Sequence, residues 1–81
     1  MILKLYIHDA LKDKIKKKYK LHEGQITVFM PKGSTVRDLL LKMELPDDWV
    51  GLIIVNNKQV NFEQVLHDKD VINIFTPMSG G

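Results

Sequence analysis

Residues 31–43 read Pro31-Lys32-Gly33-Ser34-Thr35-Val36-Arg37-Asp38-Leu39-Leu40-Leu41-Lys42-Met43, and they combine a turn with the start of a helix. The Pro-Lys-Gly segment predicts a chain reversal, because proline and glycine favour the backbone angles of tight turns. Ser34 or Thr35 then caps the helix, with Asp38 in the place of the usual Glu or Gln of a capping box. Apolar residues at i, i+3, i+4 and i+7 predict a short amphipathic helix with one buried stripe. These residues are Val36, Leu39, Leu40 and Met43.

Two alternating segments before this helix predict strands. Leu3, Leu5 and Ile7 alternate with more polar residues, and Ile26, Val28 and Met30 repeat the pattern. A period of two places every second side chain on one face of a sheet. The chain between them, residues 9–24, is expected to be a polar, lysine-rich connector with some strand character over residues 15–21.

The chain after the helix predicts a hairpin and a final strand. Leu52–Val55 and Lys58–Val60 flank Asn56-Asn57, and asparagine tolerates the positive φ of a tight hairpin turn. Phe62–Leu66 is expected to form a single helical turn, and residues 67–70 another reversal. Val71–Phe75 is the last predicted strand, with Ile72 and Ile74 on one of its faces.

The predicted order is strand, strand, helix, strand, short strand, strand. One amphipathic helix packed on one twisted sheet gives a complete two-layer core for a chain of 81 residues. We therefore predict an α+β, ubiquitin-like β-grasp fold with a mixed sheet of about five strands and one main helix. The expected core contains Leu3, Leu5, Val28, Val36, Leu39, Leu40, Ile53 and Ile74.

Composition narrows the classes of protein. The chain has no cysteine, which excludes disulfides and thiolate chemistry. It has no apolar run near the roughly 20 residues that span a membrane, and no apolar segment of a signal peptide at its start. We expect a cytoplasmic domain without a membrane partner. Lysines cluster between Lys12 and Lys20, but no recognisable nucleic-acid-binding module surrounds them, so we favour a solvated loop and expect no nucleic-acid partner.

No autonomous active site is evident in the sequence. His8, His22 and His67 lack the spacing of metal ligands, so we read them as surface residues and expect no metal. Gly33 belongs to no phosphate-binding loop, and Ser79 has no histidine placed to activate it. Any chemistry is therefore expected to depend on partner proteins.

The sequence closes with Pro77-Met78-Ser79-Gly80-Gly81 after the last predicted strand. Two residues without Cβ make a thin end that can enter a narrow channel. Pro77 cannot donate a ladder hydrogen bond and should help to release the chain from the sheet. We expect residues 1–76 to form the domain and residues 77–81 a flexible tail.

The outer face of the predicted sheet carries apolar side chains. Alternation places Phe29, Ile54 and Phe75 away from the helix. Apolar side chains that gather on a surface mark a protein interface. We expect these three residues, together with the Pro77-Met78 segment, to contact a partner.

Three segments together resemble the ubiquitin-like sulfur carriers, especially the small subunit of molybdopterin synthase. They are Pro31 to Leu40, the Val55-Asn56-Asn57 hairpin, and the ending Asp70 to Gly81 with its Phe-x-Pro-x-Ser-Gly-Gly pattern. Lys69 stands where the family commonly has a glycine.

The resemblance implies a carrier cycle that uses Gly81. A ubiquitin-activating-type adenylyltransferase would convert its carboxylate to an adenylate, and a cysteine desulfurase or rhodanese-type donor would supply sulfur to make a thiocarboxylate. These covalent intermediates replace any tightly bound cofactor. The large subunit of molybdopterin synthase would receive the tail (Pro77, Met78, Ser79 and Gly80) and use the sulfur on a pterin.

Other functions remain open. The same chemistry could serve thiamine thiazole formation or tRNA thiolation. A protein modifier would instead join Gly81 to lysines of targets. A non-catalytic β-grasp interaction module, or an RNA-binding module that uses the lysine cluster, is the least favoured alternative.

Overall fold

The computed structural model describes residues 1–8, 10–15, 19–20 and 24–77. They form five strands, two α-helices and one 3-10 helix in the order given by the following bounds: β1 Ile2–Ile7, α1 Ala10–Ile15, β2 Gln25–Phe29, α2 Val36–Lys42, η1 Asp47–Trp49, β3 Leu52–Val55, β4 Lys58–Val60 and β5 Val71–Phe75. No helix in the described ranges is long and apolar enough to cross a membrane.

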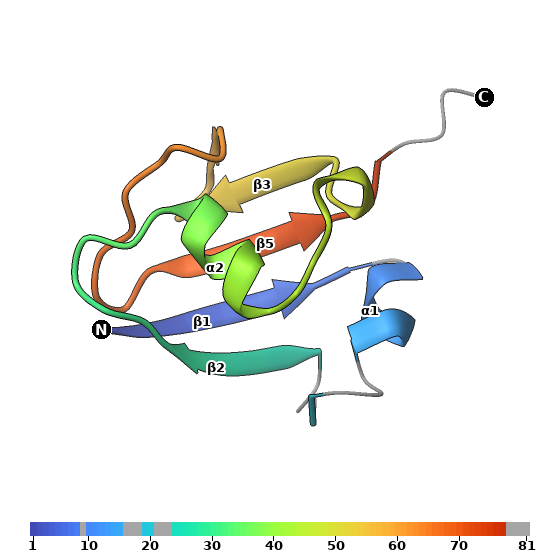
Figure 1. The fold of residues 1–81 in the computed structure, drawn as a ribbon, viewed down its shortest axis with the longest axis horizontal. Helices are drawn as coiled ribbons and strands as arrows, with labels where there is room; N and C mark the ends of the chain where they lie inside the picture. Colours follow the sequence, from blue (N-terminus) through green and yellow to red (C-terminus); the bar gives the residue numbers. More distant parts are fainter. Residues whose placement is uncertain (9, 16–18, 21–23, 78–81) are drawn as a thin grey trace.

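The five strands form one mixed sheet in the order β2-β1-β5-β3-β4. The central pair, β1 and β5, is parallel, and every other pair is antiparallel. Helix α2 crosses one face of this sheet (Figure 1). The predicted β-grasp fold is therefore confirmed.

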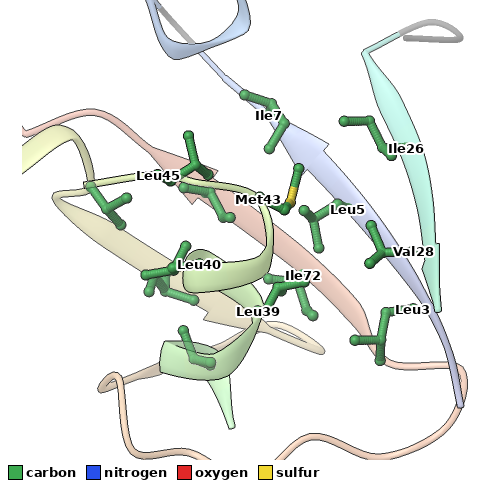
Figure 2. Packing of buried hydrophobic residues seen from close by; sticks show 14 of the residues in the cluster. Leu3, Leu5, Ile7, Ile26, Val28, Leu39, Leu40, Met43, Leu45 and Ile72 are labelled. Atoms are coloured by element: carbon green, nitrogen blue, oxygen red, sulfur yellow. The ribbon is translucent and has the colours of Figure 1, made fainter. Parts of the chain in front are cut away.

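The core lies between α2 and the sheet, as the alternation predicted (Figure 2). In β1 and β5 every second residue is buried, with Leu3, Leu5, Ile72 and Ile74 at 0% exposure. All eight predicted core residues are buried, and so is Met43 at the end of the helical stripe. Burial of apolar surface is the dominant favourable term in folding, so this layer carries most of the stability of the domain.

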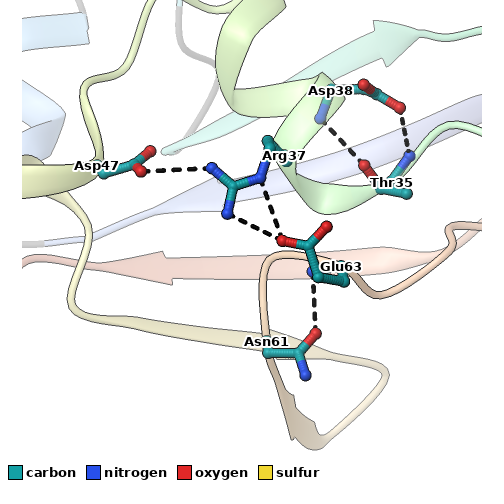
Figure 3. A network of polar contacts seen from close by, with 6 residues as sticks. All are labelled: Thr35, Arg37, Asp38, Asp47, Asn61 and Glu63. Carbon is teal, nitrogen blue, oxygen red and sulfur yellow. Dashed lines mark hydrogen bonds and ion pairs between the residues drawn. The ribbon is translucent and has the colours of Figure 1, made fainter.

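The start of α2 follows the predicted capping box (Figure 3). The Thr35 hydroxyl accepts a hydrogen bond from the Asp38 backbone N–H at 3.3 Å, and the Asp38 carboxylate accepts one from the Thr35 N–H at 2.9 Å. The turn before it is also as predicted. Ser34 N–H donates to the Pro31 carbonyl, and Gly33 takes a φ of +90° that a glycine adopts without strain.

The predicted hairpin is present, with φ of +50° at Asn56 and +72° at Asn57. The Asn56 side chain also reaches the start of β5, since its Nδ2 donates to Asp70 Oδ1 at 2.7 Å and its Oδ1 accepts from Val71 N–H at 2.9 Å. Lys69, in the predicted reversal before β5, has a φ of +70°. A left-handed φ suits glycine better than lysine, which gives a physical reason for glycine at this position in the resembling proteins.

Two local predictions were wrong. The expected connector contains helix α1, whose Leu11 and Ile15 are four residues apart and both buried in the core. Two apolar residues among lysines are too weak a periodic signal to identify a helix. Burial of these two side chains in the core stabilises the helix, and the local sequence does not show that burial. The strand character expected at Ile15 is therefore contradicted. Tyr19 and Lys20 are not in a strand either. Residues 16–18 and 21, which include Lys16, Lys17 and Lys18 of the lysine cluster, lie outside the described residues.

The helical turn predicted for Phe62–Leu66 is also absent. Val65 instead forms a β-bridge with Thr35. Arg37 N–H donates to the Phe62 carbonyl, and Leu66 N–H donates to the Ser34 carbonyl. Phe62 and Glu63 form a single hydrogen-bonded turn, in which Gln64 N–H donates to the Asn61 carbonyl. The long-range bonds to the start of α2 keep residues 64–66 from continuing it as a helix, so tertiary contacts override the local preference.

Candidate functional site

The candidate site lies at the carboxyl end of β5, where the chain leaves the sheet. We call Phe75, Thr76 and Pro77 the tail root. Strand β5 lies between β1 and β3, so its backbone is held along both edges. His8 N–H donates to the Ile74 carbonyl at 3.0 Å, and Gly51 N–H donates to the Phe75 carbonyl at 2.8 Å. These two hydrogen bonds hold the chain as far as Ile74 on one side and Phe75 on the other.

The side chain of Phe75 is covered by an aromatic neighbour. The His8 imidazole stacks on the Phe75 ring with a centroid separation of 4.2 Å and an interplanar angle of 7°. His8 Nε2 also lies 2.8 Å from Asn73 Oδ1, in a hydrogen bond that orients the imidazole. Phe75 and His8 are both half-buried as a result. The prediction that His8 is a surface histidine missed this contact, which joins residues 67 positions apart.

The backbone of the tail root passes directly over Gly51. A Cβ at this position would lie 2.4 Å from Pro77 Cα, 2.7 Å from Pro77 N and 2.9 Å from the Thr76 carbonyl oxygen. Distances under 3.0 Å are almost never seen for a Cβ. Gly51 therefore lets two backbone segments, 26 residues apart in the sequence, come into close contact.

The residues before and after Gly51 are fixed in the fold. Val50, which precedes it, is buried and donates its N–H to the Asp47 carbonyl across η1 at 3.1 Å. After Gly51, Leu52 pairs with Phe75 and Ile53 pairs with Ile74. The backbone at Gly51, against which Pro77 lies, is thus fixed by the residues on both sides of it.

An exposed ion-pair network connects α2 with η1 (Figure 3). Arg37 Nη2 lies 2.9 Å from Glu63 Oε1, and Arg37 Nη1 lies 3.4 Å from Asp47 Oδ2. The hydrogen bonding of the Arg37 guanidinium to the Glu63 carboxylate, followed by the charge of Glu63, raises the pKa of Arg37 above its ordinary value. Ion pairs this exposed typically contribute about 0–1 kcal/mol, so they add little to the stability of the fold.

Apolar side chains lie on the outer face of the sheet beside the tail root. They include Ile54 and Phe75, two of the three residues that were predicted on this face. Leu52 lies opposite Phe75, and Ile54 lies on the same face of β3, opposite Asn73. All three apolar side chains are partly exposed. We call Leu52, Ile54 and Phe75 the tail-end surface.

Phe29 does not belong to that surface, which corrects the expectation that it gathers there with Ile54 and Phe75. Strand β1 separates β2 from β5. Phe29 pairs with Ile2 at the start of β1, whereas Phe75 ends β5, which runs parallel to β1. Phe29 is 64% exposed and lies at the other end of the sheet. Alternation identified its face correctly but carries no information on strand order.

The remaining predicted site residues, Met78, Ser79, Gly80 and Gly81, lie outside the described residues. Pro77 is exposed, as a point of departure from the sheet requires. Within the described ranges, no group of three or more His, Cys, Asp or Glu residues is placed to hold a metal ion. The proposed division at residue 77 stays a prediction.

Sequence comparison identifies one family. The profile of the ThiS family matches residues 11–81, which include α1 from Leu11 onward and everything that follows it. Comparison with curated proteins finds no match.

Solved structures share the fold at low identity. A putative molybdopterin converting factor subunit 1 from Pyrococcus furiosus has a TM-score of 0.71 and 18% identity, and the match covers 96% of this chain and 99% of that one. Small archaeal modifier protein 1 from Haloferax volcanii gives 0.68 and 14%, over 95% and 98% of the two chains. A complex of subunits 1 and 2 of molybdopterin-converting factor from Helicobacter pylori gives 0.62 and 21%, with both matched chains fully covered.

Proposed function

Because this chain belongs to the ThiS family, we propose that it is a sulfur carrier that acts through a thiocarboxylate on Gly81. The geometry of the tail root is the observation that carries the proposal. A central strand, bonded along both edges, ends at Phe75, two residues before the exposed Pro77. A rigid base with a glycine-rich extension suits a domain that presents its last carboxylate to other proteins.

The proposed chemistry begins with activation of a poor electrophile. The Gly81 carboxylate oxygen attacks the α-phosphorus of ATP, and pyrophosphate leaves. A sulfide-level sulfur then attacks the acyl carbon, and the bond to AMP breaks. The product is a thiocarboxylate, whose sulfur is a better nucleophile than the original oxygen. Such covalent intermediates divide one difficult transfer into easier steps.

We propose that the recipient is a pterin and that the chain is the small subunit of molybdopterin synthase. Support comes from the P. furiosus structure and from the H. pylori complex, whose titles name molybdopterin converting factor. The H. pylori complex contains a subunit 2, so a large partner subunit is also proposed for this chain. An adenylyltransferase and a sulfur-donor protein complete the proposed set of partners.

The tail-end surface is the proposed docking site for these partners. Leu52, Ile54 and Phe75 are apolar, partly exposed and next to the point where the tail leaves. Buried aromatic anchors commonly dominate the energy of an interface. A partner that covers this surface would also receive the tail.

A second candidate is a protein modifier. The fold matches small archaeal modifier protein 1 with a TM-score of 0.68, about as well as it matches the converting-factor subunits. Gly81 would then be joined to lysine amines of target proteins. Sulfur transfer to a thiazole or to tRNA would use the same thiocarboxylate with another recipient.

Intact-mass analysis of the protein purified from its native host separates these candidates. A carrier gains the mass difference of one oxygen-to-sulfur exchange at its carboxyl end. A modifier appears in conjugates of much higher mass, joined through lysine. A protein that shows neither change under conditions of active cofactor synthesis would contradict the proposed function.

A further inference from the structure

The contact between Gly51 and the tail root has a consequence for the proposed transfer. We propose that Gly51 is a positioning residue that sets the direction in which the tail leaves the domain. The inference rests on the proposed role of Gly81, because direction matters only if the end of the chain must reach a defined reaction centre.

Space, not backbone conformation, requires glycine at position 51. Gly24 and Gly33 have φ of +80° and +90°, where a side chain would be strained. The φ of Gly51 lies outside this left-handed region. Alanine could therefore adopt the backbone of residue 51, and only its Cβ would meet the backbone of Thr76 and Pro77.

The two sides of this contact differ in their freedom to move. Val50 and Ile53 are buried on either side of Gly51, and Leu52 is paired with Phe75. Pro77 is exposed and lies beyond the last residue of β5. When a Cβ is added, moving Pro77 away from the sheet should cost less free energy than moving the backbone at Gly51. The domain should stay folded while the tail changes direction.

A small movement at Pro77 is amplified at the reacting carbon. Four residues lead from Pro77 to Gly81, and they span at most roughly 13–14 Å when extended. A change in direction at the base of such a segment displaces its end by several times the shift at the base. A misplacement of about 1 Å at a reaction centre can reduce a rate by about 10²-fold.

The test compares Gly51→Ala with Gly33→Ala as a matched control. Both changes add one methyl group to a glycine. A Cβ at Gly33 meets nothing within 4 Å, but the φ of +90° at this position is strained for alanine. We expect Gly33→Ala to lower the unfolding midpoint by roughly 4–8 °C, the shift that a loss of about 1 kcal/mol gives in a domain of this size. At temperatures below that midpoint, its kcat/KM for adenylation should stay unchanged. We expect Gly51→Ala to keep the midpoint and to lose at least about tenfold in kcat/KM for adenylation.

A second readout follows the tail without any enzyme. The sequence has no cysteine, so Ser79→Cys provides a single thiol for a nitroxide label. Paramagnetic broadening of backbone amides then reports which part of the domain the tail visits. We expect a different set of broadened amides after Gly51→Ala and the unchanged set after Gly33→Ala.

The outcomes separate this inference from the proposed function. If the unaltered protein is not adenylated, the proposed function fails, while the label still reports on the tail. If it is adenylated and Gly51→Ala matches it in kcat/KM and in broadening, Gly51 does not position the tail. A Gly51→Ala protein that loses stability like the Gly33→Ala control would also overturn the inference, because the domain and not the tail would then absorb the strain.

Discussion

His8 and Phe75 form a parallel ring stack, with centroids 4.2 Å apart, at the point where the chain leaves the sheet. Phe75 ends β5, and His8 directly follows β1, the parallel strand beside it at the centre of the sheet. The stack covers one face of Phe75 on the outer surface, while Gly51, which directly precedes β3 on the other side, donates its N–H to the Phe75 carbonyl. The base of the tail is thus fixed by a side-chain contact on one strand and by a backbone contact on the other.

Replacement of His8 by Ala should destabilise the domain modestly. The change removes the stack and the hydrogen bond to Asn73. Aromatic pairs contribute about 0.5–1.5 kcal/mol beyond the area they bury, so we expect a loss in the free energy of unfolding of that size by urea denaturation. His67→Ala is the control, because the His67 side chain is exposed and should change stability by less than about 0.5 kcal/mol. Equal values for the two variants would show that the stack contributes nothing.

The orientation of α2 is tested by two adjacent leucines. Leu40 is 1% exposed and Leu41 is 69% exposed. Leu40→Ala should cost about 2–5 kcal/mol of unfolding free energy, the usual range for a buried leucine. Leu41→Ala should cost less than about 0.5 kcal/mol, as for other exposed positions. A reversed pattern in denaturant titrations would mean that the other face of the helix packs on the sheet.

Phe75 and Phe29 test the docking surface. Phe75→Ala should weaken binding of the large subunit by more than about 1 kcal/mol in calorimetry, since aromatic anchors carry much of the energy of an interface. Phe29→Ala is the matched control, because it removes the same side chain from the same face at the other end of the sheet. Unchanged affinity for Phe75→Ala would exclude the tail-end surface. An equal loss for both variants would place the interface across the whole sheet.

The sequence predicted those features that depend on neighbouring residues. Thr35 and Asp38 are three residues apart and identified the start of α2, and Asn56-Asn57 identified the hairpin. Local patterns also separated the core side of each strand from the outer side. The roles of Phe75 in docking and of Pro77 at the start of the tail stay predictions.

The features that the sequence missed depend on contacts between distant residues. Gly51 matters because Pro77 lies over it, and His8 matters because the parallel pairing of β1 with β5 brings it to Phe75. Phe29 was misplaced because alternation gives the face of a strand and not its neighbours. Helix α1 was missed because only Leu11 and Ile15 mark its buried side.

Deletion of Gly81 tests the central claim most directly, through the rate of sulfur transfer to the pterin precursor by the assembled synthase. Removal of one residue draws the reactive carbon back by about 3.3–3.6 Å in an extended chain. The deletion lies outside the described residues that form the sheet and the core, so the unfolding midpoint should stay the same and serves as the control. We predict that thiocarboxylate-dependent product formation is abolished. A deletion protein that transfers sulfur at the normal rate would contradict the sulfur-carrier account.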